Sequence, residues 1–145
     1  MEQKIVEKAV EIFSAKRIDG VLALIDLDGY PTASAKSVLK NDGINRLIFA
    51  TGSHHAKRID KCNHASFCYF SQEYNITLIG KIEVMPDIET RKEMWQEWFG
   101  EFWSGPEDEN YCVLKFVTER YKIWIGEEEV EGTFIITVSP VCSIA

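Results

Sequence analysis

The sequence lacks the features that would place it in a membrane or on nucleic acid. No apolar run approaches the length needed to cross a bilayer. The segment from Met1 to Phe13 is charged and amphipathic, without the apolar centre of a secretory signal. Basic residues number 16 against 23 acidic ones, and the net charge is −7, so the basic face that binds nucleic acid is missing. We therefore expect neither a membrane partner nor a nucleic-acid partner.

A recognisable cysteine pattern is also missing. The spacing of the four cysteines matches neither a disulfide framework nor a Cys-x-x-Cys pair, which predicts a reducing, cytoplasmic location. His54, His55, Cys62, His64 and Cys68 lie close together in the sequence, but their spacing matches no zinc site, and adjacent histidines point apart on a helix. We predict no metal.

Signatures of protein-based catalysis are missing as well. The chain has no Gly-x-Ser-x-Gly elbow, no catalytic-cysteine signature and no Gly-x-Gly-x-x-Gly loop. Nucleophilic catalysis and a parallel dinucleotide-binding sheet therefore have no support. Any chemistry would be carried by a cofactor, and the sequence identifies no catalytic residue.

Hydrophobic patterning predicts a mainly β protein with a few helices, and a chain of 145 residues suits one domain over 1–145. Strands are expected at 20–26, 30–39, 46–51, 65–71, 76–85, 111–117, 121–125 and 133–138, and helices at 2–15, 54–62 and 87–103. Turn signals such as Asp28-Gly29 put the strands in hairpin order. Many strands in that order predict an antiparallel sheet closed as a barrel.

The stretch 47–58 reads as a buried strand, a small polar turn and the start of a helix that carries Lys57 and Arg58. Backbone N–H groups at a helix start have no partner within the helix, and nearby cations add positive charge, so a phosphate is the expected ligand. A plainer interpretation stays open, in which Ser53 is only an N-cap and the two cations form a solvated face.

Aromatic residues are dense in the predicted helix 87–103, at Trp95, Trp98, Phe99, Phe102 and Trp103. Their helical spacing predicts one apolar face, and such faces usually serve core or subunit packing. Because the face is wider than a small barrel needs, it favours a dimer.

The order of several segments resembles the pyridoxamine-5′-phosphate-oxidase-like flavoproteins, and within them the general-stress-protein branch. The resemblance runs from the first helix to about Ile125. Its cues are 29–34, 49–51 with Lys57, 63–65, Gly80, the aromatic helix, Gly105-Pro106, 112–116 and Trp124. No single cue is specific, but their order and spacing together are.

The resemblance implies a split antiparallel β-barrel of the FMN-binding type, forming a homodimer with cofactor sites at the subunit interface. It implies contacts to the flavin and its ribityl chain from Ser34, Ala35 and Lys36, and contacts to the isoalloxazine from Phe49, Ala50 and Thr51. The phosphate would be held by Ser53, His55, Lys57 and Arg58. The partner subunit's flavin would be reached by Asn75 and Trp124.

The chain departs from the family pattern at two of these positions. His55 stands where the family often has serine, which would alter the pH dependence of phosphate binding. Ser34 stands where the oxidases often carry arginine, and the C-terminal region of true pyridoxamine-5′-phosphate oxidases is not recognisable, so that activity is not expected. The resemblance implies an FMN-dependent oxidoreductase of unknown substrate with a stress role. The alternative is a non-catalytic flavin-binding, storage or sensor protein on the same dimeric fold.

Overall fold

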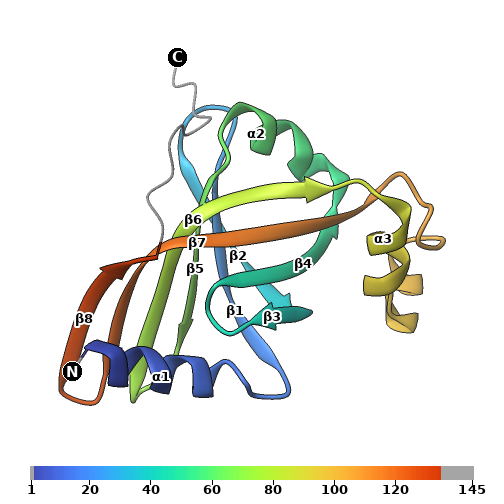
Figure 1. Ribbon diagram of the computed structural model, residues 1–145. Helices are drawn as coiled ribbons and strands as arrows, with labels where there is room; N and C mark the ends of the chain where they lie inside the picture. Colours follow the sequence, from blue (N-terminus) through green and yellow to red (C-terminus); the bar gives the residue numbers. More distant parts are fainter. Residues whose placement is uncertain (1, 135–145) are drawn as a thin grey trace.

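A computed structural model describes residues 2–134 of the chain (Figure 1). The elements are α1 (Glu2–Ile12), β1 (Ile18–Ile25), β2 (Pro31–Val38), β3 (Lys40–Asp42), β4 (Arg46–Gly52), the 3₁₀ turn η1 (Ser53–His55), α2 (Ala56–Lys61), β5 (His64–Phe70), β6 (Tyr74–Met85), α3 (Ile88–Met94), the 3₁₀ turn η2 (Glu97–Glu101), β7 (Tyr111–Ile125) and β8 (Glu128–Thr133). None of the helices in this part of the chain is long and apolar enough to span a membrane.

The strands form one curled antiparallel sheet. Its order is β2-β1-β5-β6-β7-β4-β3, and β8 pairs with β7 outside this path. The curl brings β2 and β4, which lie near opposite ends of the sheet, into contact. Since no ladder joins these two strands, the barrel stays split along this line. The split antiparallel β-barrel predicted from the sequence is confirmed.

The barrel interior is packed with aromatic and aliphatic side chains. Phe67 lies at its centre, with its ring centroid 5.3 Å from that of Phe49 and 6.3 Å from that of Phe13. Helix α1 crosses one end of the barrel (Figure 1). It buries Ile5 and Ala9 there, and Phe13, directly after the helix, is buried as well. Burying these large side chains supplies most of the stability of the barrel.

The pairing of β6 with β7 contains an irregularity between Ile79 and Gly80. A side chain at Gly80 would collide with the backbone carbonyl of Val117 on β7. Glycine in a strand interior often marks such a close approach, so the close contact of β6 with β7 at the register shift depends on Gly80.

The helix predicted over 87–103 is instead two short elements. Asp87 caps α3, since its carboxylate accepts a hydrogen bond from the Thr90 N–H at 3.1 Å. The helix ends at Met94 because Trp95 adopts an extended conformation, with φ −63° and ψ 136°, and the chain then forms η2. The aromatic residues therefore do not share one helical face as predicted.

One further prediction differs from the structure. The strands expected at 111–117 and 121–125 are the single strand β7. The acidic residues Glu128 and Glu129 lie in β8, where they pair with Ile125 and Trp124. Of the strand predicted over 133–138, the part from 135 onward lies outside the described residues.

Candidate functional site

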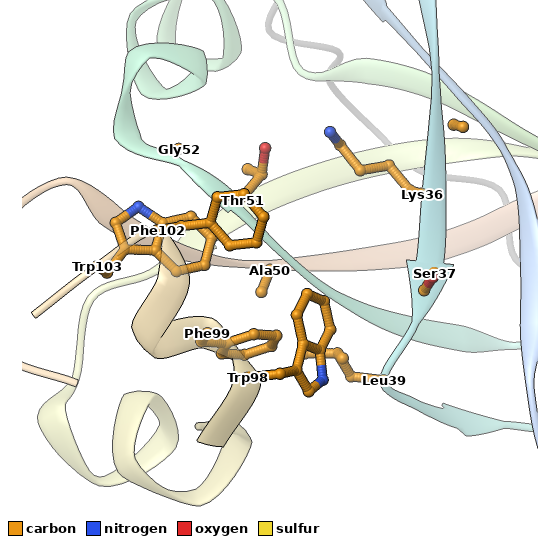
Figure 2. Close-up of a pocket in the computed structure, with 11 residues that line it drawn as sticks. Lys36, Ser37, Leu39, Ala50, Thr51, Gly52, Trp98, Phe99, Phe102 and Trp103 are labelled. Carbon is orange, nitrogen blue, oxygen red and sulfur yellow. The ribbon is translucent and has the colours of Figure 1, made fainter. Parts of the chain in front are cut away.

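An open cavity of about 370 Å³ lies in the split of the barrel, between β2 and β4 and against η2 (Figure 2). Its lining comes from three segments that are distant in sequence: Ala35, Lys36, Ser37 and Leu39; Ala50, Thr51 and Gly52; and Trp98, Phe99, Phe102 and Trp103. The site therefore exists only because the sheet curls to bring these segments together.

The walls of this cavity suit a flat ring system. The strand side carries the small residues Ala35, Ala50 and Gly52, which leave the backbone accessible. The opposite side carries Trp98 and Phe102, which are 53% and 65% exposed. Both belong to or adjoin η2. Aromatic side chains beside a cavity with a small-residue floor favour stacking against a planar ligand.

The segment η2 is anchored by Phe99, which is fully buried. Its ring packs edge-on against Trp95 and Trp103, with centroids 5.5 and 5.6 Å away, and lies 5.9 Å from Tyr111. Tyr111 donates its hydroxyl to the Arg91 carbonyl oxygen at 3.0 Å. This packing holds Trp98 and Phe102 at the cavity, although neither is buried.

Cationic groups gather at one side of the cavity. Figure 2 shows the Lys36 side chain reaching from β2 toward Thr51 on β4. Partial burial, together with the nearby Arg58 guanidinium, lowers the pKa of Lys36. Two cations held near each other favour the binding of an anion.

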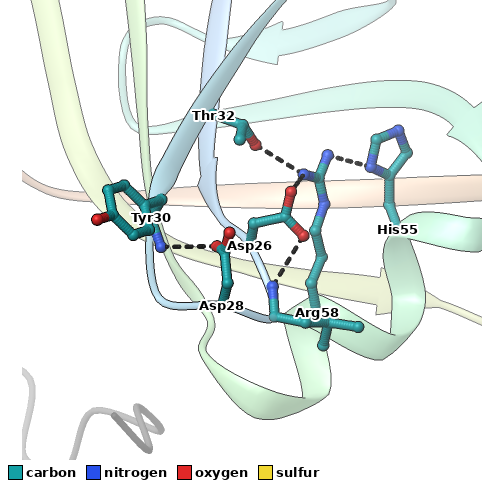
Figure 3. A network of polar contacts seen from close by, with 7 residues as sticks. Asp26, Asp28, Tyr30, Thr32, His55 and Arg58 are labelled. Atoms are coloured by element: carbon teal, nitrogen blue, oxygen red, sulfur yellow. Dashed lines mark hydrogen bonds and ion pairs between the residues drawn. The ribbon is translucent and has the colours of Figure 1, made fainter. Parts of the chain in front are cut away.

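Arg58 is held by a network within its own chain (Figure 3). Its Nη1 donates to Thr32 Oγ1 at 2.7 Å and lies 3.7 Å from Asp26 Oδ2. Its Nη2 donates to His55 Nδ1. Its Nε is buried without a hydrogen-bond partner among the described residues. The guanidinium is thus fixed in position, and its Nε–H is not used by the described residues.

His55 is only 7% exposed and stays neutral at physiological pH. Burial, followed by the charge of Arg58, lowers the pKa of His55 from 6.5 to about 4. Because Nδ1 accepts from Arg58, the hydrogen of the neutral ring is on Nε2. His55 is therefore a neutral Nε2–H donor, which can bind an anion without changing charge between pH 5 and pH 8.

This lowered pKa predicts a pH dependence of stability. A histidine whose pKa is lower in the folded state binds fewer protons than in the unfolded state, so stability is lost as pH falls from about 6.5 toward 4. We expect His55 to account for a loss of about 1–2 kcal/mol in unfolding free energy between pH 7 and pH 5. Urea unfolding of the parent protein and of His55→Gln at both pH values measures it.

The exposed neighbour provides the control. His54→Gln should keep the pH dependence of the parent, because His54 is exposed, whereas His55→Gln should flatten it. Equal slopes for the parent and His55→Gln would show that His55 does not carry the effect.

The predicted flavin-contact residues do not all face the cavity. Ala35, Lys36, Ala50 and Thr51 line it. Phe49 is fully buried, with its ring against Phe67 in the barrel interior, so only its backbone could reach a ligand there. Ser34 is exposed on β2 and is not part of the lining.

The predicted phosphate residues are also spread out. Ser53 begins η1 rather than capping it, and neither η1 nor α2 has a side-chain N-cap hydrogen bond. Lys57 is exposed on α2, and α2 has only six residues, so its dipole is weak. His55 and Arg58 lie together beside Lys36.

Asn75 and Trp124 are direct cross-strand partners on β6 and β7. Both are exposed, and Thr77 Oγ1 donates to Asn75 Oδ1 at 2.9 Å. Asn75 lies near the start of β6 and Trp124 near the end of β7. Neither residue contributes to the cavity of its own chain.

Sequence reasoning missed several residues of the site. The aromatic cluster was visible but was assigned to packing; Phe99 does pack, while Trp98 and Phe102 border the cavity. Asp26 and Thr32, which fix Arg58, carry no local signal, because their role depends on β1, β2 and α2 meeting. Within residues 2–134, no group of three or more His, Cys, Asp or Glu is arranged to hold a metal.

Comparisons place these features among known proteins. The family model described as pyridoxamine 5′-phosphate oxidase like matches residues 8–141. No curated protein sequence matches the chain. The fold is shared with a solved protein related to general stress protein 26, of the pyridoxinephosphate oxidase family, from Clostridium acetobutylicum. The two are 20% identical with a TM-score of 0.75, over 92% of this chain and 96% of the other.

Two further solved structures share the fold, and their names give two different ligands, FMN and heme. A pyridoxamine 5′-phosphate oxidase-related, FMN-binding protein from Nostoc punctiforme is 17% identical, with a TM-score of 0.63, over 89% of this chain and 86% of the other. A heme-binding protein from Mycobacterium smegmatis is also 17% identical, with a TM-score of 0.70, over 89% of this chain and 57% of the other.

Proposed function

Because the chain belongs to the pyridoxamine 5′-phosphate oxidase like family, we propose that the cavity between β2 and β4 binds FMN. The observation that carries this proposal is the pairing of a slot for a planar ring with a cationic cluster at its side. The FMN-binding relative from Nostoc punctiforme, which has the same fold, supports it.

The ring would lie against the small residues of β2 and β4, with Trp98 and Phe102 on the other side. Its phosphate would meet Lys36, the Nε2–H of His55 and the Arg58 guanidinium. Charge-assisted hydrogen bonds of this kind are about twice as strong as neutral ones. Lys57 on the surface of α2 would add long-range attraction.

Bound FMN would supply hydride or electron transfer, and the protein would supply binding, orientation and electrostatics. Among the described residues that line the cavity, Lys36 is the only one that titrates, and it faces the proposed phosphate. We therefore assign no acid or base to the chain and propose an oxidoreductase whose chemistry belongs to the flavin. The substrate and a role in stress stay predictions.

Haem is the competing cofactor, since one relative is a heme-binding protein. Haem iron takes an axial ligand from histidine, cysteine, methionine or tyrosine. The described lining of the cavity contains none of these four residue types. The donor set therefore supports FMN over haem at this site.

We propose that two chains pair so that Asn75 and Trp124 reach the partner subunit's flavin. These residues form a cross-strand row with Phe70, because Asn75 pairs with both Phe70 and Trp124. Phe70 is 61% exposed. An exposed row of two aromatics around an amide is typical of a protein interface.

The second candidate is a flavin store or sensor on the same fold. Exposed Ser34, in place of the arginine often found in the oxidases, supports this candidate. Anaerobic mixing of the loaded protein with NADH or NADPH separates the two: an oxidoreductase loses its flavin bands and regains them with oxygen, whereas a store keeps them.

The first test is the visible spectrum of the purified protein after FMN is added and the excess removed. We expect retained flavin bands whose absorbance gives one FMN per chain, and light scattering should give the mass of two chains. Riboflavin, which lacks the phosphate, should bind at least tenfold more weakly, since a charge-assisted contact is worth about 1.5–3 kcal/mol. A colourless protein that keeps no FMN would refute the proposal and leave the fold unaffected.

A further inference from the structure

The short helix α2 is tied to the hairpin of β1 and β2 by two of its side chains. The helix has six residues, and its N-cap makes no side-chain hydrogen bond. Arg58 donates from Nη1 to Thr32 Oγ1 at 2.7 Å, and Lys61, one turn later, donates to the Leu27 carbonyl oxygen. Since so short a helix has little stability of its own, these contacts help to fix where α2 lies.

The Arg58 guanidinium is held from three separate elements (Figure 3). Thr32 belongs to β2, Asp26 follows directly after β1, and His55 ends η1. Only 14% of the Arg58 side chain is exposed. A guanidinium enclosed in this way meets a ligand already ordered, so little further ordering is needed when an anion binds.

Thr32 is a rigid acceptor for this guanidinium. It pairs with Leu24 of β1, directly after the turn that joins the two strands. That turn is closed by two backbone hydrogen bonds, from the Asp26 N–H to the Tyr30 carbonyl oxygen at 2.8 Å and from the Gly29 N–H to the Asp26 carbonyl oxygen at 2.9 Å. The Thr32 hydroxyl therefore holds Arg58 against a fixed strand.

Strand β2 also carries Lys36, the other cation beside the cavity. Thr32 and Lys36 are four residues apart, so their side chains lie on the same face of the strand. One face of β2 thus presents Lys36 and holds the guanidinium of Arg58. The relative placement of the two cations is set by this one strand.

The two partners of Arg58 on the hairpin differ in what they do to an anion. Asp26 carries a negative charge, which opposes a nearby phosphate whatever its geometry. Thr32 is neutral and lies outside the cavity lining. An effect of Thr32 on the binding of an anion therefore comes from orienting Arg58 and not from charge.

We propose that Thr32 is a positioning residue for the flavin phosphate, which holds the Arg58 guanidinium in the orientation that meets the phosphate beside Lys36. This proposal rests on the proposed function, because it takes FMN as the ligand. It extends the phosphate site to a residue that touches neither the cavity nor the flavin.

The test compares the binding of FMN and riboflavin, which differ only in the phosphate, by quenching of flavin fluorescence. Thr32→Val keeps the shape of the side chain and removes the oxygen that accepts from Arg58. We expect FMN to bind about 2- to 10-fold more weakly, because a loosened arginine must be ordered on binding. Riboflavin binding should not change. Thr32→Ser keeps the hydroxyl and should restore the parent ratio of the two affinities.

Two controls separate positioning from other effects, with thermal unfolding to show that each variant is folded. Thr133→Val, at another exposed strand position, should change neither affinity. In an Arg58→Met background, Thr32→Val should cause no further loss, because the group that it orients is gone. If Arg58→Met does not fold, the comparison of valine with serine at position 32 decides alone.

Three results would overturn the proposal: an undiminished loss in the Arg58→Met background, equal losses for FMN and riboflavin, or a parent-like FMN affinity for Thr32→Val. Failure of the proposed function is seen separately, as a parent protein that retains no FMN. Calorimetric titration of the FMN-free protein with inorganic phosphate then decides the role of Thr32. A phosphate affinity that Thr32→Val lowers and Thr32→Ser keeps would support this role, whereas an affinity unaffected by both, or none, would refute it.

Discussion

Replacing Lys36 with methionine is expected to weaken FMN binding by about 1.5–3 kcal/mol, or about 10- to 150-fold. Methionine keeps most of the apolar stem and removes the charge that reaches into the cavity beside Thr51. The pKa of Lys36 is already lowered by partial burial and by Arg58, so an anion that neutralises this cluster should gain more than it would at an exposed lysine. Quenching of flavin fluorescence on titration gives the dissociation constant.

Lys57→Met is the comparison for this experiment. Lys57 takes the phosphate role by family resemblance, but it is exposed on α2 and outside the cavity, so we expect a loss of at most about 1 kcal/mol. Thermal unfolding of both variants should match that of the parent. A larger loss of FMN affinity for Lys57→Met than for Lys36→Met would show that the phosphate binds at the surface of α2 and not beside Lys36.

Gly80→Ala is expected to destabilise the fold by about 3 kcal/mol, at the upper end of the usual range for overpacking. The new methyl group would overlap the backbone carbonyl of Val117, and a backbone atom cannot rotate away as a side chain can. Relief requires β6 and β7 to separate where their register shifts. Urea unfolding monitored by circular dichroism measures the loss.

Gly105→Ala is the matched substitution, because a Cβ there meets no atom within 4 Å. It should change the unfolding free energy by less than about 1 kcal/mol. A parent-like midpoint for Gly80→Ala would mean that β6 and β7 accommodate a side chain without separating, contrary to the geometry.

Local patterns predicted the barrel because they are properties of single strands. The apolar run 21–25 and the turn at Asp28-Gly29 needed no knowledge of the rest of the chain, and both occur as expected in β1 and its hairpin with β2. The end of α3 was missed because Trp95 and Gln96 are not helix breakers. In its extended conformation, Trp95 packs its ring against Phe99 and Tyr111, a tertiary contact that the local sequence does not indicate.

The site was predicted less completely than the barrel, because it depends on contacts between segments that are distant in sequence. The resemblance to a family contains information about tertiary structure that local patterns lack. It predicted four residues that line the cavity: Ala35, Lys36, Ala50 and Thr51. The Asp26–Arg58–His55 network joins residues from the end of β1, α2 and η1. No periodicity reveals such a meeting, because it depends on how the sheet curls. The neutral state of His55 follows from its burial and from the neighbouring charge of Arg58, which no local pattern reveals.

The position of β7 has a consequence for how the chain is made on the ribosome. β4 has only the three-residue β3 as a neighbour until β7 emerges, since its other ladder is with β7. A nascent chain that ends before Tyr111 therefore exposes the edges of both β4 and β6. Such unpaired edges promote aggregation. Completion of β7 joins the two parts of the sheet in one step, so release of soluble protein should depend on translation passing this strand.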